Sequence, residues 1–150
     1  MVIDMSRSLV DILLVEDSPS DAMMTREALL EYRVLNPLHV AEDGVAAMRY
    51  LKQRGPDGLA HRPGLIILDL NLPKMSGREV LQELKRDPAL SDIPVVVLTT
   101  SKAEEDVLRS YGLHANCYIT KPVDFEKFTE VVRSISDFWF SVVTLPPVKP

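Results

Sequence analysis

The sequence predicts an α/β protein with a doubly wound, five-stranded parallel sheet. Short apolar runs rich in β-branched residues alternate with amphipathic stretches, five times in succession. Each strand-then-helix unit needs a crossover connection, which makes the strands parallel. Right-handed crossovers then place helices on both faces of the sheet. The length of 150 residues suits one such domain. We therefore expect a domain over residues 11–140, an extension over 1–10 and a tail over 141–150.

The first two units lie before the glycine- and proline-rich stretch 55–64. Asp11–Val15 is predicted to be a buried strand, and a helix follows because Ser18 and Pro19 suit its N-cap and first position. Leu38–Ala41 is a short second strand, and Gly44–Arg54 is a second helix. The apolar positions expected to face the core are Ala22, Met23, Leu29, Leu30, Val45, Met48 and Leu51.

The remaining three units follow the same alternation. Strands are predicted over Leu65–Leu68, Val95–Leu98 and Cys117–Thr120. The helices that follow them are expected over Ser76–Lys85, over Glu104–Tyr111, and from about Asp124 to about Phe140.

Composition excludes several classes of protein. No apolar run approaches the roughly 20 residues of a membrane helix, and Asp4 and Arg7 interrupt any secretory signal. A net charge of -5 argues against a nucleic-acid partner. The single cysteine, Cys117, fits a reducing compartment. We expect a cytoplasmic protein with neither a membrane nor a nucleic acid as partner.

Polar residues follow four of the five predicted strands. The carboxyl ends of parallel strands share one edge of the sheet, where ligands bind. The residues expected there are Glu16, Asp17, Asp69, Thr99 and Lys121. Two carboxylates about 4 Å apart repel by roughly 4 kcal/mol at an effective dielectric of about 20, so this cluster needs a cation or raised pKa values. Carboxylate oxygens favour Mg²⁺, and a carboxylate beside Mg²⁺ can be phosphorylated while the hydroxyl and the ammonium hold phosphoryl oxygens.

Four motifs resemble those of the response-regulator receiver domain: Val15-Glu16-Asp17, Leu68 to Pro73, Val97 to Thr100, and Lys121-Pro122. The resemblance spans about residues 11–140. It implies a flavodoxin-like sheet in the order 2-1-3-4-5, and a lysine–proline bond that is often cis.

The same resemblance assigns roles to the site residues. Asp69 would be the phosphoacceptor. Asp17, Asp69 and the backbone carbonyl of Asn71 would bind Mg²⁺ directly, with Glu16 acting through water. Thr99 and Lys121 would contact the phosphoryl group, and Tyr118 occupies the position of the aromatic switch. The resemblance therefore implies a regulator that takes a phosphoryl group from a histidine kinase and acts through protein contacts.

A narrower resemblance links three segments to the stand-alone regulators of bacterial phytochromes. These segments are 93–101, 115–121 and 138–140. The resemblance implies a light-regulated histidine kinase as the partner. Thr100 departs from the receiver pattern, which often has alanine there, and its larger side chain is expected to narrow access for the phosphodonor.

The last predicted helix carries more apolar residues than one buried face needs. They are Phe128, Val131, Val132, Ile135, Phe138, Trp139, Val142 and Val143. Exposed apolar surface often marks a protein interface. We expect a homodimer through this helix and the neighbouring fourth and fifth units, with extra core packing as the alternative.

Other interpretations of the same residues remain open. Asp69 alone suits a loop cap. A Mg²⁺-dependent aspartyl-phosphate phosphatase is the enzymatic alternative, although Asn71 stands where such an enzyme has its general acid. A flavin module and a degenerate, purely scaffolding receiver fit the acidic strand ends less well. The histidines (His39, His61 and His114) are scattered over different units, and Cys117 suits a buried small side chain.

Overall fold

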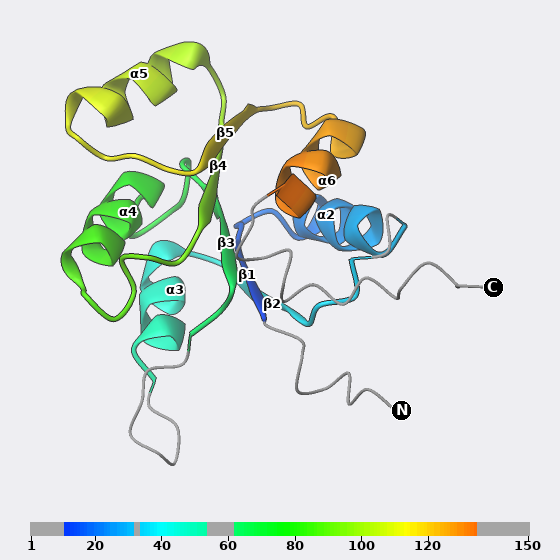
Figure 1. Cartoon of the computed structure of the whole chain (residues 1–150), viewed down its shortest axis with the longest axis horizontal. Coiled ribbons are helices and arrows are strands. Elements are labelled where there is room, and N and C mark those ends of the chain that lie inside the picture. The colour runs from blue at the N-terminus through cyan, green and yellow to red at the C-terminus, as the bar shows by residue number, and fades with distance from the viewer. Residues whose placement is uncertain (1–10, 32–33, 54–61, 135–150) are drawn as a thin grey trace.

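Five parallel strands form one sheet in the order β2-β1-β3-β4-β5, which confirms the expected topology. The computed structural model describes residues 11–31, 34–53 and 62–134. The strands are β1 Ile12–Val15, β2 Leu38–Ala41, β3 Leu65–Asp69, β4 Val95–Thr99 and β5 Cys117–Thr120. The helices are α2 Pro19–Glu31, α3 Gly44–Leu51, α4 Gly77–Arg86, α5 Lys102–Ser110 and α6 Phe125–Ser134 (Figure 1).

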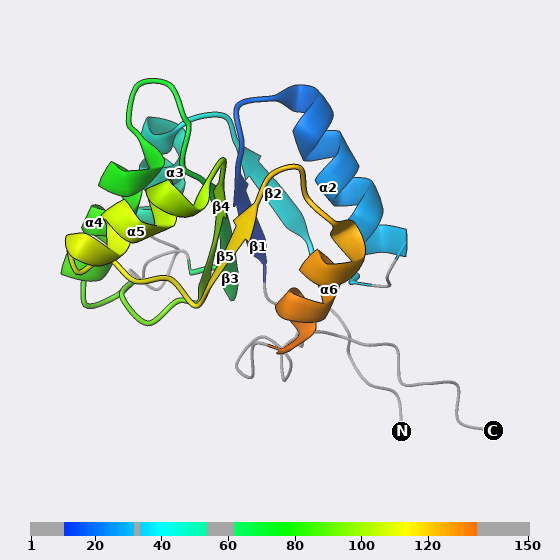
Figure 2. The same cartoon turned by 90° about the horizontal axis from the view of Figure 1, so that it is seen from above.

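The sheet is the middle of three layers. Helices α2 and α6 cover one face, and α3, α4 and α5 cover the other (Figure 2). Successive strand residues point to opposite faces, so Leu13 and Ile66 enter the core under α3–α5 whereas Leu14 and Ile67 enter the core under α2 and α6. The central strands are buried on both faces, which explains why their sequences are continuous apolar runs.

Side-chain caps set where the helices begin. The Ser18 hydroxyl accepts the Asp21 N–H at 3.3 Å, as expected for the N-cap of α2. Asp43 and Ser76 cap α3 and α4 in the same way. Ser101 caps α5, which therefore starts at Lys102 rather than at the predicted Glu104. Helix α3 ends at Leu51, earlier than the predicted Arg54.

Three predicted core positions are wrong. Met23, Leu30 and Val45 are 61%, 57% and 41% exposed. The buried face of α2 consists instead of Ala22, Thr25, Ala28 and Leu29. Neighbouring helix positions differ by about 100°, so Met23 and Leu30 lie outside the stripe that these four residues form against the sheet. Met48 and Leu51 are buried as predicted.

Several expectations lie outside the described residues. These are the extension 1–10, the tail 141–150, His61, and the course of the last helix beyond Ser134. In the part that the structure describes, none of the helices combines the length and the apolar character that a bilayer crossing requires.

Candidate functional site

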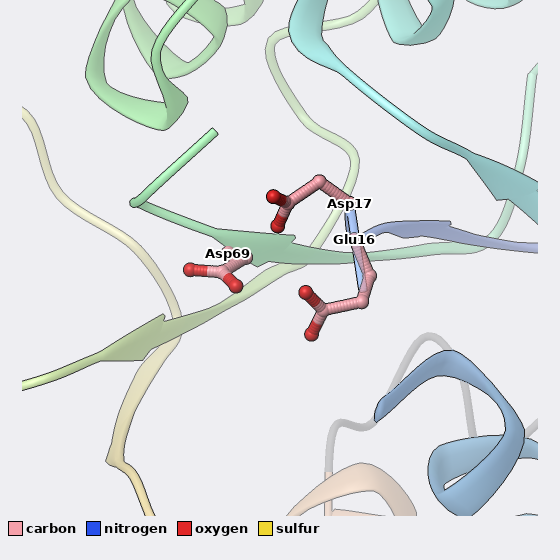
Figure 3. Close-up of side chains that lie close together, drawn as sticks. All are labelled: Glu16, Asp17 and Asp69. Carbon is pink, nitrogen blue, oxygen red and sulfur yellow. The ribbon is translucent and has the colours of Figure 1, made fainter. Parts of the chain in front are cut away.

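The three predicted acidic residues come together at the carboxyl end of the sheet. Glu16 and Asp17 follow β1, and Asp69 is the last residue of β3, the neighbouring strand (Figure 3). Because Val15 pairs with Leu68, the two strands end side by side. One carboxylate oxygen from each residue lies within 4.8 Å of the other two. Glu16 and Asp69 are buried, whereas Asp17 is exposed, so the cluster has one open side.

The Lys121 ammonium joins this cluster from the end of β5. Its Nζ lies 2.6 Å from Asp69 Oδ2 and 3.4 Å from Glu16 Oε1. It also lies 3.7 Å from Asp21 Oδ2, on the first turn of α2. The Lys121–Pro122 bond is cis, as the resemblance implies. Burial lowers the lysine's pKa, but the hydrogen bonds and charges of Asp69 and Glu16 outweigh it and the net pKa is raised.

Crowding of the acids changes the titration of Glu16. Burial, then a hydrogen bond to Asp69 and the charge of Asp69, raise its pKa from 4.5 to about 7, although Lys121 opposes the shift. The sequence predicts a nearby cation or raised pKa values for such a cluster. The structure has both, because the lysine compensates part of the charge and Glu16 holds its proton more tightly.

Both oxygens of Asp69 have a partner that fixes the carboxylate. Oδ1 accepts the Asn71 N–H at 2.9 Å, and Oδ2 accepts from Lys121. The amino end of α4 packs directly behind this strand end. A Cβ at Gly77 would collide with the Asp69 carbonyl oxygen and with Leu70 Cα. Only glycine therefore allows α4 to start this close to Asp69.

Thr99 ends β4 beside Asp69, in a register that pairs Asp69 with Leu98. The residue is 1% exposed, and its buried hydroxyl oxygen has no hydrogen-bond partner among the described residues. A buried hydroxyl normally has one. Thr99 can therefore accept or donate a bond to a ligand at this edge.

Tyr118 lies on β5, next to β4, and is half-buried. Its hydroxyl donates to the Leu113 carbonyl at 3.3 Å and accepts the Ala115 N–H at 3.0 Å. The Arg109 guanidinium of α5 lies 4.7 Å above its ring. The tyrosine is thus bound to the loop that precedes β5 rather than to the acidic cluster.

No pattern in the sequence predicts two of the contacts at the site. Asp21 pairs with Lys121, and Glu104 accepts two hydrogen bonds from Thr100. The spacing Ser101-x-x-Glu104 marks a helix start, but nothing in it indicates a bond to Thr100. The Thr100 hydroxyl is thus hydrogen-bonded to Glu104, on the first turn of α5.

The histidines and the cysteine have other surroundings. His39 stacks on Tyr50 with ring centroids 4.1 Å apart, and His114 is exposed. Cys117 is half-buried against the core under α2 and α6, and burial raises the pKa of its thiol. Cys117 therefore packs largely as predicted.

The donor set fits a divalent metal ion. Three carboxylates that converge from two strands offer the hard oxygen ligands that Mg²⁺ prefers. The exposed side at Asp17 leaves room for water or phosphate oxygens, which Mg²⁺ normally keeps in its coordination shell.

Comparison with known proteins settles the family. Residues 12–133 match the sequence profile described as the response regulator receiver domain. The chain belongs to this family. It is a response regulator of the two-component phosphorelay type, and the profile spans nearly all of the described residues.

Phytochrome response regulators are among its relatives. Response regulator Rcp1 of Synechocystis sp. is 50% identical over 90% of this chain and 92% of Rcp1. The structure of the Mn²⁺-bound form of Rcp1 superposes with a TM-score of 0.69, covering 91% of this chain and 99% of that one. The phosphorylated cyanobacterial phytochrome response regulator RcpA is 49% identical with a TM-score of 0.70, over 89% and 95% of the two chains. The bacteriophytochrome response regulator AtBRR is 42% identical with a TM-score of 0.74, over 88% and 94%.

Proposed function

We propose that Asp69 is the phosphoacceptor of this response regulator. A carboxylate oxygen of Asp69 attacks the phosphorus of a phosphohistidine, a new P–O bond forms, and the P–N bond breaks. The imidazole nitrogen leaves with the bonding electron pair and takes up a proton. The supporting observation is that Asp69 is buried at a strand end, held on both oxygens, and surrounded by the ammonium of Lys121 and two further acids.

The neighbouring residues supply positioning and charge. Glu16, Asp17, Asp69 and the Asn71 carbonyl would hold Mg²⁺, which when bound neutralises charge on the phosphoryl oxygens. Lys121 and Thr99 bind those oxygens, the former as a point charge and the latter through its unpartnered hydroxyl. Phosphoryl transfer depends mainly on such positioning and electrostatic stabilisation.

The phosphorylated form signals by shifting an equilibrium between two conformations. Thr99 moves toward the phosphoryl group, and Tyr118 turns inward and changes the face formed by the fourth and fifth units. The half-buried position of Tyr118 and its bonds to loop backbone are compatible with such a switch.

The phosphodonor is a cytoplasmic histidine kinase of the phytochrome type. The names of two relatives, RcpA and AtBRR, support this partner. A cavity of about 390 Å³ lies beside the site, and its walls include the polar residues Glu16 and Lys121 and the apolar residues Met24 and Phe125. A donor histidine carried on an apolar helix suits these walls.

The chain acts as a signalling receiver and not as a phosphatase of small molecules. Asn71 stands where an aspartyl-phosphate phosphatase has a general acid, and an amide cannot donate a proton in that way. We expect no turnover of para-nitrophenyl phosphate, and steady release of nitrophenol with Mg²⁺ would favour the enzyme instead.

The active unit is a homodimer that uses the last helix and the neighbouring fourth and fifth units. The described part of α6 gives Phe128 and Val132 to the core, whereas Val107 on α5 and Tyr111 at its C-cap are exposed. Further apolar residues follow Ser134 in the sequence. Analytical ultracentrifugation at micromolar concentration tests this, and a monomer both with and without phosphorylation would contradict it.

Intact-mass spectrometry tests the central proposal. After incubation with acetyl phosphate and Mg²⁺, the wild-type chain should gain the mass of one phosphoryl group, and Asp69→Asn should gain none. Asp106→Asn, at an exposed position on α5, is the matched control and should be phosphorylated like the wild type. Phosphorylation of Asp69→Asn at the wild-type rate would overturn the assignment.

A further inference from the structure

The peptide group between Thr99 and Thr100 is held from both sides. The Thr99 carbonyl accepts the Lys121 N–H at 2.7 Å. The Thr100 N–H, on the same peptide, donates to Glu104 Oε1 at 2.5 Å, and the Thr100 hydroxyl donates to this oxygen at 2.7 Å. Glu104 Oε1 therefore holds Thr100 in place, directly after Thr99, the threonine proposed to bind the phosphoryl group.

This contact differs from ordinary helix capping. In a capping box, the glutamate three positions after the cap binds the N–H of the cap residue itself. Here Ser101 is the cap of α5 and accepts the Glu104 N–H at 3.4 Å. The Glu104 side chain, however, reaches back past Ser101 to Thr100. Glu104 thus ties the first turn of α5 to the end of β4.

The arrangement that Glu104 holds leaves the Thr99 hydroxyl buried without a partner. An unpaired buried hydroxyl is unfavourable. A phosphoryl oxygen on Asp69 would pair with it once the strand end adjusts, and that adjustment works against the bonds of Glu104.

We propose that Glu104 is a positioning residue that restrains Thr99 in the unphosphorylated form and thereby weakens phosphoryl binding at Asp69. The inference deepens the proposed function and rests on it. Glu104 does not touch the phosphoryl group. It acts through the Thr99–Thr100 peptide. The strength of its hydrogen bonds with Thr100 sets how readily the receiver enters the phosphorylated conformation.

Titration with beryllofluoride, a phosphoryl mimic, in the presence of Mg²⁺ tests the restraint by calorimetry. Glu104→Met keeps the side-chain length but removes the acceptor, and should tighten beryllofluoride binding about tenfold, equivalent to about 1.4 kcal/mol. Glu104→Gln keeps an oxygen acceptor and should tighten binding clearly less. Asp106→Asn is the matched control, because Asp106 is an exposed carboxylate on the same helix, and should leave the affinity unchanged.

Two further measurements separate restraint from general effects. In a Thr99→Val background, Glu104→Met should no longer alter the affinity, because the hydroxyl through which it acts is absent. Without metal or beryllofluoride, hydrogen exchange of the Thr100 amide should be faster in Glu104→Met than in the wild type, since the N–H loses its acceptor.

The outcomes discriminate between this inference and the function on which it rests. Equal tightening by Glu104→Met and Glu104→Gln would overturn the restraint, since loss of charge alone would explain it. Unchanged or weaker binding in Glu104→Met would overturn it as well. If the wild-type chain itself binds no beryllofluoride and gains no phosphoryl group, the proposed function fails first.

Discussion

The central strands and the edge strands of the sheet carry different residues of the site. Every residue of β1, β3 and β4 is buried, whereas β2 and β5 are mostly half-buried or exposed. Asp69 and Thr99 are the last residues of central strands, and Glu16 follows one directly. Lys121 and Tyr118 belong to the edge strand β5 and the turn after it. The core thus holds the acidic groups Glu16 and Asp69 in place, whereas Tyr118, which the proposed switch requires to move, lies at the edge.

The largest expected effect comes from shortening a side chain in a central strand. Ile67 on β3 is fully buried, and Ile67→Ala should lower the free energy of unfolding by about 2–5 kcal/mol, because the change leaves a cavity. Ile119→Ala makes the same change on β5, where the side chain is half-buried, and should cost about 1 kcal/mol.

Urea denaturation of both variants measures the difference between centre and edge. The slope of the unfolding free energy with urea should stay constant, so that midpoints report stability. Equal losses from the two substitutions would show that the edge strand is packed as firmly as the centre.

The sequence predicted the residues at the strand ends better than the side-chain contacts of the helices. Strand ends follow from where apolar runs stop, so Glu16, Asp69 and Thr99 could be placed from pattern alone. The exposure of Met23 could not be predicted in this way. The buried face of α2 consists mostly of small residues, and larger apolar residues stand next to them in the sequence. The bond from Glu104 to Thr100 depends on side-chain direction at a helix start, which no spacing rule specifies.

A second effect concerns the backbone behind Asp69. Gly77→Ala forces the start of α4 away from the Asp69 carbonyl, and should destabilise the fold by about 1–3 kcal/mol as an overpacking change. Gly112, which precedes the edge strand β5, has φ of 70° and open space around it. Asparagine tolerates this backbone region, so Gly112→Asn should cost less than about 1 kcal/mol.

Thermal unfolding compares these two glycine variants. Gly77→Ala should also slow phosphorylation by acetyl phosphate, because the displaced helix adjoins the phosphoacceptor, whereas Gly112→Asn should not. A larger loss of stability in Gly112→Asn would place the tighter constraint at the edge of the sheet and would contradict the comparison.

A third prediction uses the titration of Glu16. Its pKa is about 7 in the folded chain against 4.5 ordinarily, so between these pH values the folded form binds more protons than the unfolded form. Metal-free stability should therefore fall as pH rises from 4.5 to 7, by about 1–2 kcal/mol, which is less than the full shift because water and Lys121 screen the carboxylate.

Unfolding curves at pH 5, 6 and 7 in chelator test this dependence. Glu16→Gln should lose this component of the slope, because the amide does not titrate. Added Mg²⁺ should stabilise the wild type more at pH 7 than at pH 5, since only the ionised cluster binds it well. An identical pH slope in wild type and Glu16→Gln would contradict the raised pKa.

The smallest expected effect tests how firmly the edge strand holds its tyrosine. The guanidinium of Arg109 lies over the Tyr118 ring and is itself bound twice by Glu105, at 3.2 and 3.0 Å. A double-mutant cycle of Arg109→Gln and Tyr118→Leu should give a coupling of about 0.5–1 kcal/mol, the range of a solvent-exposed cation–π pair. The Arg78–Tyr111 pair, with its guanidinium 4.0 Å from the ring, provides the matched cycle away from β5.

If Tyr118 is the switch, only the Arg109 cycle should change on addition of beryllofluoride, because only that ring would leave its guanidinium. Equal coupling with and without beryllofluoride would mean that the ring keeps its place, and the adjustable part of the site would then be confined to Thr99 and Lys121.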